Sequence, residues 1–505
     1  MISPRANLEL ARPAEISRKS NLPEKISDKS IEPARPGEML VKLRSSAEME
    51  KFIFGVRKLG GQVLANIPRL GAVRIAFDNE EQGAAIRELV PESGSAEPNY
   101  LVFTPTPPDA AGDGGGGYLG FGREALSWLG VPEDNANWGE GIKVAVLDTG
   151  IYAVPGVGGI RQFDLVGGEI GAGDLPVHGT SVASILAGTS AEGRGVAPGA
   201  ELLSYRVLDD TGVGDSFTVA QGILDAVDAG VRVISMSIGS GGDSAVLREA
   251  INHALARNVA VVAAVGNEGV GSVSFPAHYP GVIAVTAVDA NGQRGSFANY
   301  GNAVSLAAPG IGVLTPWRDA SEVNFSGTSA AVPFVSGTLA MLFAENPSLT
   351  AVQAGRLLVQ YANDAGAPGQ DAYYGSGILD ISRLLTRNQP GINDVAMADI
   401  YYNPKVAKPG SAALPVQVTV QNRGTTSLAN LTLQVTNNGQ TQRFLLSGLA
   451  AGSVSSQTIE IDPAALGSEA GVRLQSQVQI NGVQDVNLGN NQRGVTLRLK
   501  APVGE

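Results

Sequence analysis

Three short motifs carry the side chains best suited to chemistry. In chain order they are Val144-Ala-Val-Leu-Asp-Thr-Gly150, His178-Gly-Thr180 and Phe325-Ser-Gly-Thr-Ser-Ala-Ala-Val-Pro333. They supply a carboxylate, an imidazole and a hydroxyl, the three groups that turn a weakly nucleophilic serine into an acyl-transfer catalyst. We predict that Asp148 orients and supports His178, that His178 takes the proton of Ser329, and that Ser329 attacks a carbonyl carbon.

Each of these side chains falls where a ligand site can form. Asp148 ends an apolar segment, so its carboxylate lies at the carboxyl end of a strand. Ser329 precedes a helical segment that starts near Ala330, where unpaired N–H groups face developing negative charge. Asn267 lies just beyond another buried strand, and we predict that its amide and the Ser329 N–H form the oxyanion hole.

Taken singly, such motifs have ordinary structural explanations. A lone Asp-Thr-Gly or Gly-Thr-Ser is more often a turn, and only the order and spacing of all three make that explanation implausible. Other polar features remain structural in our interpretation: His253 lies on a helical segment and His278 in a loop. The Asp209-Asp210 pair is better explained as an exposed acidic turn than as a metal site.

The segment that carries the motifs alternates strands and helices. Short apolar runs rich in β-branched residues are typical of strands buried on both faces of a parallel sheet. The expected strands are 143–147, 202–207, 231–237, 259–264 and 282–287, and the expected helices are 181–186, 217–229, 245–257 and 330–345. We therefore predict a multidomain chain whose residues 118–390 form a doubly wound α/β domain with a mostly parallel sheet.

The regions before this domain have their own patterns. Residues 1–37 lack apolar periodicity and predict a flexible leader. Residues 38–103 show the order β-α-β-β-α-β, typical of a small ferredoxin-like α+β unit. Residues 104–117 are dense in proline and glycine, which predicts an exposed linker and a processing site between about Val102 and Gly117.

The sequence pattern changes again in residues 391–505. Apolar and polar residues alternate in 416–420, 431–435 and 478–480, and Asn438-Gly439 is a hairpin signal. We predict an antiparallel, all-β sandwich without catalytic groups, because this region has no histidine and no acidic cluster.

Composition narrows the function classes. The 505 residues have a net charge of −12, which disfavours nucleic acid and anionic membranes as partners. The absence of cysteine excludes thiolate catalysis and disulfides. We see neither a membrane span nor a signal peptide in the sequence, and whether a signal was trimmed stays open.

The motifs together resemble the subtilisin-like (subtilase) serine peptidases. The Asp, His, Ser order, the Gly-Thr-Ser-x-Ala-x-Pro motif and Ala-Ala-x-Gly-Asn-Glu-Gly carry this resemblance over about residues 120–387. It implies a serine endopeptidase acting on polypeptides. Ser181 stands where many members have a second histidine, and we expect no loss of chemistry because His178 is the base.

The resemblance also implies a substrate cleft. A peptide would lie between two edges by β-augmentation, and small residues at the first specificity pocket imply room for a large apolar side chain, with Glu268 at the rim admitting a basic one. The cleft edges are Val213, Gly214, Ser237, Ile238 and Gly239, and the pocket residues are Ala263, Ala264, Gly266 and Glu268.

The same resemblance implies roles for residues 38–103 and for the C-terminal sandwich. Residues 38–103, which end in Glu97-Pro-Asn-Tyr100, are similar to the family's inhibitory prodomain, an intramolecular inhibitor released by autoprocessing. The C-terminal sandwich is similar to adhesion-type modules, which implies a surface or polysaccharide partner and a secreted or cell-surface location. The chemistry requires no cofactor; calcium is a common structural ion of the family, and the sequence assigns no ligands to it.

Two alternatives stay open from the sequence. One is a catalytically silent subtilase-fold binding protein, against which the intact Asp148, His178, Ser329 and Asn267 argue. The other is an adhesin whose peptidase serves only its maturation or release.

Overall fold

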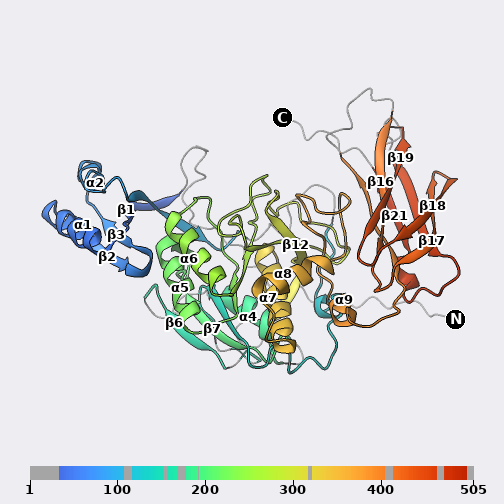
Figure 1. The fold of residues 1–505 in the computed structure, drawn as a ribbon, viewed down its shortest axis with the longest axis horizontal. Helices are drawn as coiled ribbons and strands as arrows, with labels where there is room; N and C mark the ends of the chain where they lie inside the picture. The colour runs from blue at the N-terminus through green and yellow to red at the C-terminus, as the bar shows by residue number, and fades with distance from the viewer. Residues whose placement is uncertain are drawn as a thin grey trace.

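The computed structural model describes residues 33–106, 117–152, 154, 156–157, 159–167, 178–190, 193–316, 321–403, 413–462 and 471–497. Three units lie in a row, with an α+β unit at one end, an α/β unit in the middle and a β-sandwich at the other end (Figure 1). Most of the predicted leader, residues 1–32, and most of the predicted linker, residues 107–116, lie outside the described residues.

The first unit has the predicted element order. It consists of β1 (Ala34–Lys42), α1 (Ser46–Lys58), β2 (Gln62–Ile67), β3 (Ala72–Ala76), α2 (Glu80–Arg87) and β4 (Ser95–Phe103). Ser45 and Asn79 cap the two helices with side-chain oxygens. Apolar side chains of β1, β3 and both helices, among them Phe52, Val56 and Ile86, form its core.

This sheet continues into the next unit. Strand β4 pairs antiparallel with β8 (Val213–Asp215), so the sheet has five strands in the order β2-β3-β1-β4-β8. The sequence placed Val213 and Gly214 in a loop at a cleft edge. They form a strand here because the partner strand supplies its hydrogen bonds, a tertiary effect that local sequence does not encode.

The α/β unit is built on a seven-stranded sheet in which each adjacent pair is parallel. Its order is β12-β11-β10-β9-β5-β7-β6. The strands are β5 (Lys143–Asp148), β6 (Arg161–Asp164), β7 (Glu201–Arg206), β9 (Val233–Met236), β10 (Ala260–Ala264), β11 (Ile283–Val288) and β12 (Val304–Pro309). The strand order reverses beside β5, and ligand sites of doubly wound sheets form at such a switch point.

Helices cover both faces of this sheet. One hydrophobic core contains residues of α4 (His178–Ala187) and α7 (Thr328–Glu345), and the other contains residues of α5 (Ser216–Asp228) and α6 (Ala245–Ala256). The remaining elements are α3 (Ala125–Trp128), α8 (Ala351–Gln360), α9 (Ile381–Thr386), and the hairpin of β13 (Val313–Pro316) and β14 (Glu322–Phe325). Helix α7 is apolar and long enough to cross a bilayer, but 89% of it is buried inside the protein, as a core helix must be.

The predicted doubly wound fold is confirmed, with local differences. The sequence did not predict β6, which reads Arg-Gln-Phe-Asp and lies at the sheet edge, where polar side chains are tolerated. Helix α7 begins at Thr328, two residues before the expected Ala330, so Ser329 lies inside its first turn.

The C-terminal unit is a sandwich of two antiparallel sheets, as predicted. One has the order β15-β16-β19 and the other β18-β17-β20-β21. The strands are β15 (Val395–Tyr402), β16 (Leu414–Asn422), β17 (Leu428–Asn437), β18 (Gln440–Leu449), β19 (Val454–Ile461), β20 (Val472–Ile480) and β21 (Gln492–Leu497). Asn438 and Gly439, at φ values of 46° and 86°, form the expected tight turn between β17 and β18.

Candidate active site

The carboxylate and the imidazole of the first two motifs form a hydrogen-bonded pair. Asp148 ends β5 and is 1% exposed. His178 begins α4, and its Nδ1 lies 2.8 Å from Oδ1 and 3.0 Å from Oδ2 of Asp148. Thr149 donates both its backbone N–H and its hydroxyl to Oδ1 of Asp148, at 2.7 and 3.2 Å. This arrangement fixes the ring so that Nε2 points away from the carboxylate.

Gly179 makes the close approach of this pair sterically feasible. A Cβ at this position would lie 2.3 Å from the carbonyl oxygen of Gly150 and 3.1 Å from Oδ1 of Asp148. The Gly179 N–H also donates to the hydroxyl of Thr149 at 3.3 Å. Any larger residue would therefore push α4 away from the end of β5, which explains the glycine after the histidine.

The hydroxyl of Ser329 does not hydrogen-bond to the imidazole in this structure. Ser329 is 1% exposed, and its Oγ donates to the carbonyl oxygen of Ser237 at 3.4 Å. Nε2 of His178 is buried and has no hydrogen-bond partner among the described residues. The expected serine–histidine contact is thus not made. Oγ is carried by a single χ1 bond, and catalytic hydrogen bonds often tighten only in the substrate complex.

Asn267 is held by one end of its amide and points the other end into the cleft. Its Oδ1 accepts from the backbone N–H and the hydroxyl of Thr328, at 3.0 and 2.9 Å. Its Nδ2 donates to the carbonyl oxygen of Thr106 at 2.9 Å. Gly327, at a φ of 130°, leaves the space for this amide, because a Cβ there would lie 2.7 Å from Nδ2. The amide N–H that we predicted for an oxyanion therefore already binds a carbonyl oxygen.

The segment that ends in Thr106 lies between the two predicted cleft edges. Phe103 exchanges two backbone hydrogen bonds of 2.8 Å with Gly239, on one side. On the other side Leu101, Val102 and Phe103 pair with β8, and the Thr104 N–H donates to the carbonyl oxygen of Gly212 at 2.9 Å. This is β-augmentation of both edges by one extended strand.

Side chains of the same strand contact the ends of two helices. The carboxylate of Glu97 accepts from the Ser244 hydroxyl at 2.6 Å and from the Ala245 N–H at 2.8 Å, at the start of α6. Oδ1 of Asn99 accepts from the Ser216 hydroxyl and the Phe217 N–H, at the start of α5. Both contacts satisfy groups that a helix leaves unpaired at its N-terminus.

The predicted pocket residues are arranged differently around the loop after β10. Ala263 and Ala264 are fully buried in the two hydrophobic cores of the sheet. Glu268 is an exposed residue, and its carboxylate accepts from the Asn299 amide at 2.5 Å. At Gly266, with a φ of 103°, an added Cβ would lie within 2.6 Å of this carboxylate, of the Asn299 amide and of the Ser274 hydroxyl. The groups that an added Cβ at Gly266 would meet are therefore polar, and the role of these residues as a specificity pocket stays a prediction.

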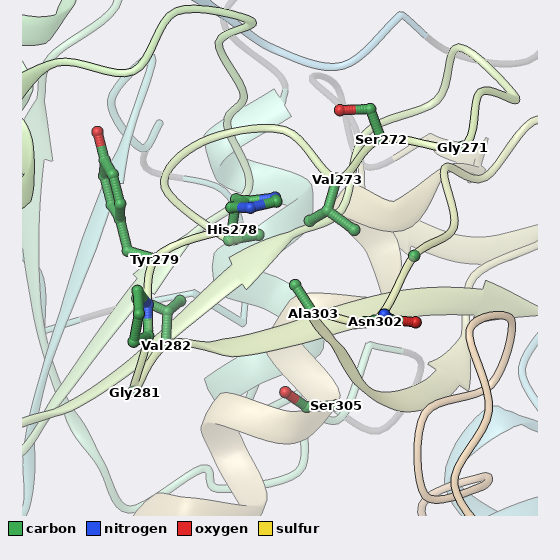
Figure 2. A pocket seen from close by; sticks show the side chains of 13 residues that line it. Gly271, Ser272, Val273, His278, Tyr279, Gly281, Val282, Asn302, Ala303 and Ser305 are labelled. Carbon is green, nitrogen blue, oxygen red and sulfur yellow. The ribbon is translucent and has the colours of Figure 1, made fainter.

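Other polar groups of the sequence do not join this site. Asp209 closes its own turn by accepting from Thr211 and Val213, and Asp210 accepts from Arg206. His278 lines a cavity of about 630 Å³ formed by residues 271–273, 277–282, 301–303 and 305, with no carboxylate in its lining (Figure 2). Within the described ranges, no group of three or more His, Asp or Glu side chains could hold a metal ion.

Sequence reasoning missed the residues that support the site from outside its motifs. Thr106 contacts Asn267, Asn299 contacts the residue after it, and Glu97 and Asn99 contact the starts of α6 and α5. Three of these residues lie in the first unit or at its end, and Asn299 is about 30 residues beyond Asn267. No sequence motif that we recognised contains Asn299. Glu97 and Asn99 lie in the prodomain-like end that the sequence did single out, which could have pointed to them.

Comparison with known proteins agrees with this geometry. The model of the subtilase family matches residues 139–377, and the model of the CARDB family matches residues 395–495. The chain is 41% identical over 244 residues to subtilisin Savinase of Lederbergia lenta, which covers 48% of this chain and 90% of that protein. It is 39% identical over 248 residues to a thermostable alkaline protease of Halalkalibacterium halodurans. This match covers 49% of this chain and 68% of that protein.

One solved structure extends the likeness of fold to nearly the whole chain. It is fervidolysin of Fervidobacterium pennivorans, a keratinolytic enzyme related to subtilisin. The match covers 92% of this chain and 91% of fervidolysin, with a TM-score of 0.59 and 21% identity. This structural match shows a likeness of fold. The sequence relatives, of which subtilisin Savinase is 41% identical and covered over 90% of its length, show that the chain belongs to the subtilase family of serine peptidases.

Proposed function

We propose that this protein is a serine endopeptidase that hydrolyses peptide bonds through an acyl-enzyme on Ser329. We propose further that it is made as a zymogen, with residues 38–103 as its prodomain, residues 104–117 as the linker that is processed, and residues 118–390 as the catalytic domain. The observation that carries this proposal is the hydrogen bond from Asn267 to the Thr106 carbonyl, because it places a peptide carbonyl at the predicted oxyanion hole.

We assign each step of the proposed reaction to one of the described residues. Ser329 Oγ attacks the carbonyl carbon while its proton passes to Nε2 of His178, and Asp148 stabilises the resulting imidazolium. The negative oxygen is held by Nδ2 of Asn267 and by the Ser329 N–H, which lies in the first turn of α7. His178 then protonates the leaving nitrogen, and a water molecule hydrolyses the ester by the same steps in reverse order.

The first unit supports a second role, as folding aid and inhibitor. Its strand β4 fills the cleft edges that a peptide substrate would use. Its Arg69 forms two 2.8 Å hydrogen bonds with Asp228 of α5, and its Arg74 lies 3.3 Å from the buried carboxylate of Asp215. We propose that these contacts stabilise the catalytic domain during folding and exclude other peptides until the linker is cut.

We propose a binding role for the C-terminal sandwich and an extracellular location. The match to the CARDB family and the similarity to adhesion-type modules support a surface or polysaccharide partner. Membership of the subtilase family supports the extracellular location. The proposed binding role and the proposed location do not depend on whether Ser329 is catalytically active.

Labelling with a fluorophosphonate tests the reaction. We expect the full-length protein, incubated until its N-terminal unit is released, to carry the label on Ser329 and to hydrolyse casein. Ser329→Ala should do neither, whereas Ser326→Ala, a change of a serine in the same motif, should keep both. A released protein that neither labels at Ser329 nor cleaves casein would contradict the proposal and favour a silent binding module.

A further inference from the structure

We infer that Pro105 makes the strand in the cleft an inhibitor of Ser329 and a poor substrate, because proline cannot donate the hydrogen bond that the residue beside the nucleophile would make. The inference rests on the proposed function and specifies how that site is kept latent. Its basis is a mismatch of one residue. The backbone pairing sets Pro105 opposite Ser237, whereas Asn267 binds the carbonyl oxygen of Thr106.

The position of Pro105 follows from the pairing of the residues before it. Phe103 and Gly239 exchange two backbone hydrogen bonds of 2.8 Å. In an antiparallel pair such hydrogen-bonded partners recur at every second residue, so Pro105 and Ser237 are the next pair along the strand. Pro105 is buried at this place.

Ser237 lies beside the nucleophile. Its hydroxyl donates to the carbonyl oxygen of Ser329 at 2.9 Å, and the hydroxyl of Ser329 donates to the carbonyl oxygen of Ser237 at 3.4 Å. A residue with an N–H that faced Ser237 would donate to this same carbonyl, as Phe103 does to Gly239. Proline has no N–H, so the carbonyl accepts from the nucleophile instead.

The hydroxyl of Ser329 is consequently turned away from its base. Nε2 of His178 has no hydrogen-bond partner among the described residues. General-base catalysis requires the contact between these two groups, because the proton of Ser329 must pass to the imidazole as Oγ attacks. The missing N–H of Pro105 thus affects the nucleophile itself.

The carbonyl groups of the strand are out of step in the same way. An oxyanion hole must hold the oxygen of the carbonyl that the nucleophile attacks. Pro105 faces Ser237, beside the nucleophile. The amide of Asn267 instead binds the next carbonyl, that of Thr106, at 2.9 Å. The strand is therefore held at both cleft edges but is not aligned for hydrolysis, which is how an inhibitor binds.

Pro105→Ala tests the inference in the full-length protein. The new N–H can donate to the carbonyl oxygen of Ser237, which releases the hydroxyl of Ser329 and lets the carbonyl of residue 105 move to the oxyanion hole. The bond from Ser329 Oγ to this carbonyl carbon then forms, the bond from that carbon to the Thr106 nitrogen breaks, and His178 delivers the serine proton to the nitrogen. Water afterwards hydrolyses the ester.

We expect the Pro105→Ala chain to be cut roughly tenfold faster than the wild type, the size of effect that one neutral backbone hydrogen bond can have. The new N-terminus should be Thr106, and the rate should be independent of protein concentration because the reaction is intramolecular. Intact mass and N-terminal sequencing over time measure both quantities.

Matched variants separate the alternatives. Pro98→Ala, an exposed change in β4, also replaces a proline of this strand but leaves position 105 intact, so it should process like the wild type. Pro105→Ala combined with Ser329→Ala should stay uncut. Wild type cut after Pro105 as fast as Pro105→Ala, or a Pro105→Ala product that begins at another residue, would overturn the inference.

A pair of synthetic peptides isolates the N–H from other effects of the proline ring. Peptides of residues 97–110 with alanine or N-methylalanine at position 105 differ only in whether that nitrogen carries a hydrogen or a methyl group. The released wild-type enzyme should hydrolyse the alanine peptide after position 105, and the N-methylalanine peptide roughly tenfold more slowly. Equal rates would overturn the inference, even if the Pro105→Ala chain failed to fold.

Fluorophosphonate labelling tells the failure of this inference apart from that of the proposed function. If Ser329 labels but Pro105→Ala is processed no faster than the wild type, the reaction stands and the role of Pro105 is wrong. If Ser329 does not label in any released variant, the proposed function fails and the inference fails with it.

Discussion

Asn299 holds the backbone on both sides of Asn267, although it lies in none of the motifs. Its own N–H donates to the Gly266 carbonyl oxygen at 3.0 Å, and its Oδ1 accepts from the N–H groups of Glu268 and Val270, each at 3.1 Å. The residue is 1% exposed, so water does not compete for these bonds. We interpret Asn299 as a positioning residue that acts through Asn267.

A double-mutant cycle measures this coupling. We expect Asn267→Ala to lower kcat on the order of 10²–10³, the loss that removal of this type of donor causes in subtilisin. Asn299→Ala should lower kcat by roughly ten- to hundredfold, because the donor is displaced and not deleted. In the Asn267→Ala background the second change should cost little, since no donor remains to be positioned.

Controls distinguish positioning from general destabilisation. Asn299→Asp keeps the acceptor for Glu268 and Val270, and with Glu268→Gln to avoid two facing carboxylates it should recover most of kcat. Asn302→Ala, at the cavity of Figure 2, should leave kcat unchanged. Additive losses in the cycle, measured on a peptide substrate with the released enzyme, would contradict the role of Asn299.

At the scale of single residues, the sequence predicted one contact of the site correctly and missed others. Asp148 and His178 pair as their motifs imply, and Asn267 presents its amide to a carbonyl oxygen. The hydroxyl of Ser329 instead faces Ser237, because its rotamer depends on neighbours that the motif does not contain. Glu268 likewise turns to a partner from a distant loop, which no local pattern encodes.

Side chains of the first unit contact the N-termini of two helices of the α/β unit. Glu97 reaches the N-terminus of α6, where it accepts from Ser244, Ala245 and Val246. A carboxylate at this end also complements the positive end of the helix dipole. Glu97 of the first unit therefore adds to the capping that Ser244 provides, and this contact supports the folding role that we propose for that unit.

Glu97→Ala should weaken the contact between the first unit and the α/β unit. We expect the full-length Ser329→Ala protein, which cannot process itself, to lose about 0.5–2 kcal/mol of unfolding free energy when this cap is removed. Denaturant unfolding followed by circular dichroism measures the change. Glu92→Ala, at an exposed acidic position in the same unit, is the control and should be neutral within about 0.5 kcal/mol. Equal stability of the Glu97 variant and its parent would argue against capping.

The sequence predicted helices and strands correctly where a local pattern of apolar residues determines the secondary structure. Buried β-branched runs such as 143–147 became strands within a residue or two, and the β-α-β-β-α-β alternation of the first unit appears in the structure. Strand β8 was missed because three residues become a strand only when β4 pairs with them. The polar edge strand β6 was missed for a related reason, since position in the sheet, and not composition, makes it extended.

On the scale of the whole molecule, the α/β unit and the sandwich meet through buried polar contacts. Gln421 of β16 accepts from the Asp364 N–H and donates to the carbonyl oxygen of Ala362, each at 3.0 Å. Asp399 of β15 accepts from the Gly366 N–H at 2.7 Å. A cavity of about 430 Å³ lies at this junction, lined by residues of both units including Asp364. The two units are thus joined by specific hydrogen bonds and not by a linker alone.

We expect this junction to respond to pH through the carboxyl of Asp364. Asp364 is 3% exposed, and its Oδ2 has no hydrogen-bond partner among the described residues. Burial raises the pKa of its carboxyl from 3.8 to about 7, and the nearby carboxylates of Asp371 and Asp399 act in the same direction. A raised pKa means that the folded state favours the protonated form. The stability that this group contributes is therefore fully present below pH 3.8 and is lost as the pH rises through about 7.

Asp364→Asn should flatten this part of the stability profile. The amide keeps an oxygen for the Gly369 N–H, which donates to Oδ1 at 2.8 Å, but it cannot ionise. In the Ser329→Ala protein we expect Tm to fall between pH 5.5 and 8.5, and to fall less when Asp364→Asn is added. Glu460→Gln, an exposed change on β19, should follow the parent profile. Parallel profiles for the parent and Asp364→Asn, measured by differential scanning calorimetry, would show that this carboxyl does not ionise in the folded protein over that range, and the junction would then not respond to pH through Asp364.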